Sequence, residues 1–133
     1  MQSTRGGQRA LPRHVLRARP SATGRARQHV RSELSPILSA SKVTDAELMT
    51  TELVSNAIRH AGLPEGDSIG LEFSVELETV RVAVVDAGSG FASAPPATEE
   101  GIGGWGLVLI ERLSDRWGVH SAHPHSVWFE IER

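Results

Sequence analysis

The spacing of apolar residues predicts two amphipathic helices in the first half of the chain. In the first, apolar residues recur at every fourth position, as on one face of an α-helix, and Ser21 precedes them as an N-cap. These positions are Ala22, Ala26, Val30, Leu34 and Leu38. In the second, Thr44 and Glu47 have the spacing of a capping box, and Gly62 is placed to end the helix. Its apolar stripe consists of Ala46, Met49, Leu53, Ala57 and Ala61, widened by Val54 and Ile58.

Two strands are predicted in the middle of the chain, where the period of the pattern changes to two residues. Residues 69–77 carry an apolar side chain at every second position, which is typical of a half-buried strand. A tight turn at Glu78 and Thr79 then leads into Val80–Val85. This nearly continuous apolar and β-branched run is typical of a central strand.

Shorter segments complete the predicted fold. His14–Arg19 alternates weakly before Pro20 and is interpreted as an edge strand. A third helix is expected to begin at the glycines around Trp105, and two closing strands are expected at Trp117–His120 and Val127–Ile131. We therefore predict an α/β (α+β) fold, a two-layer sandwich in which a mixed, mostly antiparallel sheet carries about three helices on one face.

Charge is distributed unevenly along the chain. The net charge is -2, but residues 1–31 hold eight arginines and no acidic residue, so the remainder is strongly acidic. This arginine-rich segment lacks aromatic residues for base stacking, which favours a solvated charge run over nucleic-acid binding. We expect residues 1–12 to form a disordered basic tail before a folded domain at residues 13–133.

Composition also excludes several classes of protein. The absence of cysteine excludes disulfides and thiolate metal sites. No apolar run has the length of a signal peptide or a membrane span, so we expect a cytoplasmic protein that does not contact membranes.

Two polar residues lie together in the second predicted helix. Glu52 and Asn56 are four residues apart, so their side chains lie one above the other, where a carboxylate and an amide can face the same ligand. The alternative is that both are ordinary polar residues on the solvent side of an amphipathic helix.

Two glycine motifs follow the predicted central strand. Asp86-x-Gly88-x-Gly90 combines a carboxylate at a strand end with glycines that let the backbone approach a flat ligand, although an ordinary turn has the same composition. Gly104-x-Gly106 opens a helix, where free backbone N–H groups and the positive end of the helix dipole can hold phosphate oxygens.

In this order, the three motifs resemble the nucleotide-binding boxes of the GHKL (histidine-kinase-like) ATPase superfamily over roughly Ser21–Arg133. The segments ELVSNAIRHAG and GLVLIERLSDRWGV are similar to those of bacterial anti-sigma factor serine/threonine kinases. The resemblance implies a Bergerat-type ATP-binding fold, with ATP and Mg²⁺ as ligands. It also implies a sigma factor and an anti-anti-sigma antagonist as protein partners, and it is compatible with a homodimer.

The resemblance further assigns roles to individual residues. Glu52 would be the general base for a partner's serine or threonine, Asn56 would coordinate Mg²⁺, and Asp86 would accept a hydrogen bond from the adenine amine. Further nucleotide contacts would come from Gly88 and Gly90 at the base, Gly104 and Gly106 at the phosphates, and Arg59, His60 and Ser126. For these last three, ordinary surface or strand-edge roles fit the sequence equally well.

One departure from the family pattern bears on catalysis. Kinases of this family tend to carry an arginine in the lid before or within the Gly-x-Gly box, whereas this chain has Ile102 and Trp105 there. No Lys or Arg occurs between Arg81 and Arg112. This departure favours an alternative function, a non-catalytic, nucleotide-dependent module that regulates transcription by sequestering a partner protein.

Two aromatic clusters have other interpretations. His120, His123 and His125 have metal-binding side chains, but strand alternation places neighbouring residues on different faces, so we do not expect a metal site there. Trp117 and Trp128 are expected to pack between the two closing strands.

Overall fold

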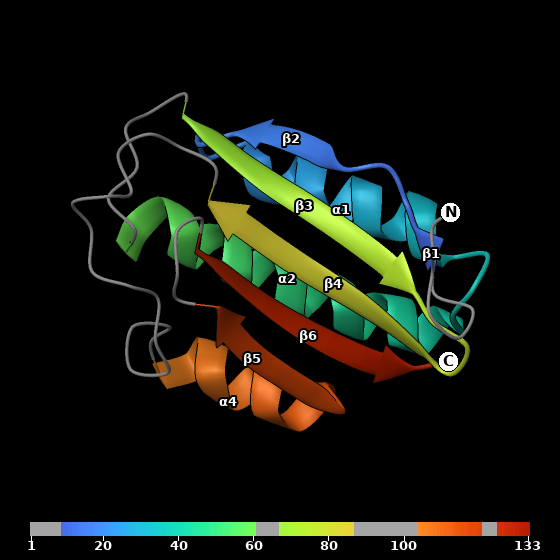
Figure 1. The fold of residues 1–133 in the computed structure, drawn as a ribbon. Coiled ribbons are helices and arrows are strands. Elements are labelled where there is room, and N and C mark those ends of the chain that lie inside the picture. Colours follow the sequence, from blue (N-terminus) through green and yellow to red (C-terminus); the bar gives the residue numbers. More distant parts are fainter. Residues whose placement is uncertain (1–8, 61–66, 87–103, 121–124) are drawn as a thin grey trace.

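The computed structural model describes residues 9–60, 67–86, 104–120 and 125–133, without the side chains of residues 60 and 104–107. In these ranges an open six-stranded sheet has the order β1-β3-β4-β6-β5, with β2 also paired to β3 (Figure 1). The strands are β1 (Arg9–Ala10), β2 (His14–Arg17), β3 (Ser68–Val75), β4 (Thr79–Asp86), β5 (Arg116–His120) and β6 (Ser126–Glu132). All pairings between them are antiparallel.

The three helices of the described ranges are α1 (Ala22–Leu34), α2 (Ala40–His60) and α4 (Gly104–Leu113). They cover one face of the sheet, because a single hydrophobic cluster joins them to the inward-facing residues of the strands. The cluster contains Val30 of α1, Met49 of α2 and Ile110 of α4, each fully buried, together with Phe73 of β3 and Phe129 of β6. The predicted two-layer fold class is confirmed.

The start of the chain differs from the prediction. Residues 9–12 were expected to belong to a disordered tail, but β1 pairs with the end of β3, and the backbone N–H of Leu11 donates to the carbonyl of Phe73. β2 continues along the same edge of β3, as predicted for an edge strand. Pairing with β3 orders β1, which has no apolar pattern of its own. Residues 1–8 lie outside the described residues.

Neither of the two predicted N-cap side chains makes the capping hydrogen bond that was expected of it. Ser21 does occupy the N-cap of α1, but its side chain makes no capping hydrogen bond. The next helix, α2, begins at Ala40, a turn before the predicted Thr44, and the hydroxyl of Ser39 accepts from the backbone N–H of Lys42 at 3.3 Å. Ser39 thus satisfies one of the free N–H groups of the first turn, and Thr44 lies inside the helix, where it cannot act as the N-cap.

The carboxylate predicted to complete that capping box has a different partner. Glu47 accepts two hydrogen bonds from the Arg31 guanidinium, at 3.0 and 3.1 Å, and so links α2 to α1.

The turn between β3 and β4 lies one residue earlier than predicted. Thr79 is already the first residue of β4 and pairs with Glu132. Leu77, the last apolar residue of the predicted strand, is 72% exposed because β3 ends at Val75. The interpretation of residues 80–85 as a central strand is confirmed, since β4 lies between β3 and β6.

Candidate functional site

The candidate site lies at the edge of the molecule where four elements have their ends. The C-terminal ends of α2 and β4 and the N-terminal ends of β6 and α4 gather there, on the left of Figure 1. Contacts of α2 with β4, β6 and α4 hold these elements together. This edge brings residues of the predicted motifs into one region although they lie far apart in the sequence.

Four of the predicted site residues lie on the last turns of α2: Glu52, Asn56, Arg59 and His60. Asn56 is 9% exposed, and its side-chain nitrogen Nδ2 is buried without a hydrogen-bond partner among the described residues. Its amide oxygen Oδ1 accepts a hydrogen bond from the Arg59 guanidinium at 3.2 Å, so the oxygen faces a cation. Glu52 is half-buried one turn earlier, and within the described part of the chain no hydrogen bond or ion pair engages its carboxylate. The helix therefore presents a free carboxylate and a cation-facing amide oxygen.

The buried carboxylate of the site is Asp86, the last residue of β4. It is 3% exposed, and its backbone N–H donates to the carbonyl of His125 at 2.9 Å. Ser126 follows His125 as the first residue of β6 and pairs with Val85. The antiparallel ladder between β4 and β6 thus places Ser126 diagonally opposite Asp86.

His125 is a buried residue of this region that the sequence interpretation did not assign to it. The residue is 8% exposed and precedes Ser126 directly. Its signal in the sequence was only its membership of a histidine cluster. Among the described residues no group of His, Cys, Asp or Glu has the arrangement of a metal site, and His123 lies outside them.

The remaining predicted residues are only partly described. Gly104 is the first residue of α4 and Gly106 lies in its first turn, while His60 is the last residue of α2. Gly88 and Gly90 lie outside the described residues, as do residues 91–103, which are expected to form the lid over the phosphates.

The two tryptophans of the closing strands lie on opposite faces of the sheet. Trp117 is partly buried against the core, and its indole N–H donates to Glu111 of α4 at 3.0 Å. Trp128 lies on the outer face, under the guanidinium of Arg81 at 3.8 Å from the ring centre. Each tryptophan therefore contacts residues on its own face of the sheet, Trp117 those of the core and Trp128 the side chain of Arg81.

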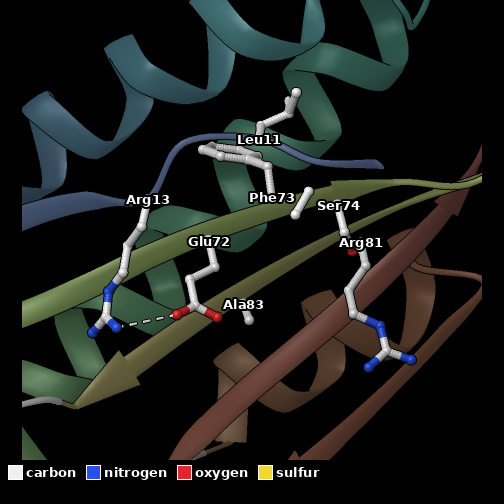
Figure 2. Close-up of a pocket in the computed structure, with 8 residues that line it drawn as sticks. Leu11, Arg13, Glu72, Phe73, Ser74, Arg81 and Ala83 are labelled. Carbon is white, nitrogen blue, oxygen red and sulfur yellow. Dashed lines mark ion pairs between the residues drawn. The ribbon is translucent and has the colours of Figure 1, made fainter. Parts of the chain in front are cut away.

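A pocket of about 340 Å³ lies away from this site, on the outer side of the sheet (Figure 2). Its charged residues are Arg13 and Glu72, whose side chains form an ion pair at 3.3 Å, and Arg81. The walls also include Leu11 and Ser74. None of the predicted site residues lines this pocket, and we assign it no part in nucleotide binding.

None of the helices in the described ranges has the length and apolar character that a membrane crossing requires.

Comparisons with known proteins agree with this architecture. A search of curated protein sequences found no match. Among solved structures, one similar to this chain is the crystal structure of the RsbU and RsbW domains of Rv1364c from Mycobacterium tuberculosis. The similarity has a TM-score of 0.67 and 19% sequence identity over 92% of this chain. The match covers 33% of the Mycobacterium chain, so our chain spans about a third of that protein's length.

The family comparison covers most of the chain. The profile of the histidine kinase-like ATPase domain matches residues 16–129, a range that includes α2, β4 and α4. Membership of this family implies an ATP-binding domain, and it confirms the resemblance derived from the motifs. The chain belongs to the histidine kinase-like ATPase domain family.

Proposed function

We propose that the protein binds Mg-ATP at this edge and acts as an anti-sigma factor with serine/threonine kinase activity toward an anti-anti-sigma antagonist. The observation that carries the proposal is the position of Asn56 and Asp86. Both are buried polar residues, they come from separate motifs, and they lie at the converging ends of α2 and β4. Buried polar side chains of this kind are concentrated at ligand sites, and a bound nucleotide with its metal would interact with both residues.

The residues fit the two ligands chemically. The oxygen of Asn56 already contacts a guanidinium, so it is directed to a position that a cation can reach. One protein oxygen suffices for Mg²⁺, because phosphates and waters complete its octahedron. A buried carboxylate at Asp86 suits the exocyclic amine of adenine and would select adenine over guanine, which presents a carbonyl at that position.

The same edge offers groups for phosphoryl transfer. ATP would supply the phosphoryl group, and Glu52 would orient the hydroxyl of the partner's serine or threonine and accept its proton. Its carboxylate is half-buried and engages no described partner, so it is available to an incoming hydroxyl. The first turn of α4, with Gly104 and Gly106, would receive the phosphates.

A second candidate is a nucleotide-dependent binding module that does not transfer phosphate. The absence of Lys and Arg between Arg81 and Arg112 favours it, because transferring phosphoryl groups are usually stabilised by a nearby cation. In that case ATP would shape the surface that binds a sigma factor, without phosphorylating an antagonist.

Calorimetric titration of ATP, with and without Mg²⁺, tests nucleotide binding. We expect magnesium-dependent binding to the wild type, weakened at least about tenfold in Asn56→Ala and Asp86→Ala by loss of a buried polar contact. Asp45→Asn is the matched control, because Asp45 lies on the same helix about 16 Å before Asn56 and should leave binding unchanged. Absence of ATP binding to the wild type would refute the proposal.

A phosphotransfer assay then separates the two candidates. Incubation with radiolabelled ATP and candidate antagonist proteins should label a serine or threonine in the kinase case. Glu52→Gln should then keep ATP affinity and lose the label. Equal labelling in wild type and variant would exclude Glu52 as the base, and nucleotide binding without any labelling would favour the binding module.

A further inference from the structure

The hydrogen bond between Arg59 and Asn56 occupies the atom that the proposed function assigns to the metal. One nitrogen of the guanidinium lies 3.2 Å from Oδ1 of Asn56, three residues earlier on α2. The other polar atom of that amide, Nδ2, is buried and has no hydrogen-bond partner among the described residues, so Oδ1 is the atom through which this side chain makes a described contact. The structure therefore places a cation of the protein itself on this oxygen.

A guanidinium and a magnesium ion cannot share this position. A Mg²⁺ ligated by Oδ1 would lie about 2 Å from the oxygen and would keep a shell of waters and phosphates around it. A guanidinium bonded to the same oxygen would stand within a few ångströms of the ion, where two positive charges repel and the water shell lacks space. Binding of the metal thus requires Arg59 to leave Asn56.

Arg59 is able to leave. Its side chain is exposed, in contrast to the buried amide, and it is long and flexible enough to be solvated elsewhere. Within the described part of the chain, its hydrogen bond to Asn56 is the one contact that holds the guanidinium. Among the described residues, breaking that hydrogen bond is enough to clear the oxygen.

We propose that Arg59 is a latch on the metal ligand: it holds the Asn56 oxygen in the nucleotide-free protein and is displaced when Mg²⁺ arrives with the nucleotide. This inference rests on the proposed function and adds a regulatory role for one residue of the same site. The Arg59 guanidinium gives the Asn56 oxygen a hydrogen-bond donor while no metal is bound. It also makes the site respond to the free Mg²⁺ concentration, because metal and guanidinium compete for one oxygen.

The test measures how strongly Mg²⁺ and ATP promote each other's binding. ATP affinity of the full chain is determined by calorimetry in EDTA and at saturating free Mg²⁺, and the ratio of the two affinities reports the coupling. We expect Arg59→Met to raise the ratio on the order of fivefold, which corresponds to one exposed charge-assisted hydrogen bond.

Two further variants complete the series. Arg59→Lys keeps a cation on a shorter side chain and should give an intermediate ratio. Arg112→Met removes an equally exposed arginine from the last turn of α4 and should leave the ratio at the wild-type value.

A direct readout comes from ¹⁵N nuclear magnetic resonance of the side chains. On addition of Mg²⁺ and ADP, the Arg59 guanidinium and Asn56 amide signals should shift together, whereas ADP in EDTA should leave the pair in contact. An unchanged or lower ratio in Arg59→Met, with normal magnesium-dependent ATP binding in the wild type, would overturn the latch and leave the proposed function intact. Absence of ATP binding to the wild type would overturn both.

Discussion

The ion-pair network on the outer face of the sheet allows a prediction about the order of three substitutions. Glu130 of β6 has a side chain that is only 5% exposed, although the three helices of the described ranges lie on the opposite face of the sheet. Its Oε2 atom accepts from Nη2 and Nε of Arg81, at 2.7 and 2.9 Å, and its Oε1 lies 3.5 Å from Arg116. The two arginines differ in exposure, at 36% for Arg81 and 71% for Arg116.

The loss in unfolding free energy depends on whether a substitution leaves the buried Glu130 carboxylate without a close cation. Arg81→Met leaves the carboxylate buried beside a single distant cation and also removes the contact with Trp128, so we expect a loss of about 3 kcal/mol in unfolding free energy. Glu130→Gln keeps an acceptor and leaves only an arginine that water can reach, so we expect about 1–2 kcal/mol. Arg116→Met breaks a surface pair and should cost under about 0.5 kcal/mol.

Urea denaturation monitored by circular dichroism measures this order. With roughly 3–4 °C in melting temperature per kcal/mol for a domain of this size, the three variants are also resolved by thermal unfolding. A double variant, Arg81→Met with Glu130→Met, should regain part of the loss because no charge remains buried. The reasoning is refuted if Arg116→Met costs as much as Arg81→Met, or if Glu130→Gln is the most destabilising of the three.

Three further predictions concern single contacts. Thr50→Val should raise the unfolding free energy by about 1 kcal/mol in urea titrations, because the Thr50 hydroxyl is fully buried and has no hydrogen-bond partner among the described residues; a loss of stability would show that the hydroxyl has one. Burial, the neighbouring His14 and Arg25 lower the pKa of His29 below 6.5, so its neutral form favours folding. The stability should therefore be complete above pH 6.5 and fall as the pH drops through the folded-state pKa, and His29→Phe should flatten that dependence between pH 7 and 5. Gly118→Ala should cost about 1–2 kcal/mol in the same titrations, since a Cβ there would lie 2.7 Å from the Trp128 ring. Gly70→Ala, which meets only the flexible end of an arginine, should cost less, and equal costs would contradict the steric argument.

The spacing of apolar residues correctly predicted those helices and strands that bury one face against the core. In β3 the alternating residues Ile69, Leu71 and Phe73 are at most 2% exposed, and in α1 the fourfold spacing from Ala22 to Leu34 is buried throughout. Such patterns are visible in the sequence because each element has its own hydrophobic face. The fold class followed from them.

Caps and short pairings were not predictable in the same way. Ser39 and Thr44 both precede the apolar stripe of α2, and either offers a hydroxyl to free N–H groups, so local sequence does not distinguish them. β1 has two residues and is ordered by pairing with β3, a contact between segments more than sixty residues apart.

For the candidate site, spacing along α2 predicted that Glu52 and Asn56 share a face, which the helix confirms. The hydrogen bond from Arg59 to Asn56 is a choice among several arginine rotamers, and spacing alone does not select it. The burial of His125 depends on how β6 begins against the end of β4, and therefore on tertiary structure.

The ladder between β4 and β6 connects the outer ion pair to the candidate site. Arg81 pairs with Glu130 and Val85 with Ser126 in one continuous antiparallel register, so the rung that holds the ion pair and the rung beside Asp86 belong to the same alignment. A slip of one residue would turn every side chain of β6 to the other face, and the buried Phe129 opposes such a slip independently of the charges. We therefore expect Glu130→Gln to lower stability without changing ATP affinity in calorimetry. A parallel loss of ATP affinity in the folded variant would mean that the ion pair, and not the apolar face of β6, sets the register on which the site depends.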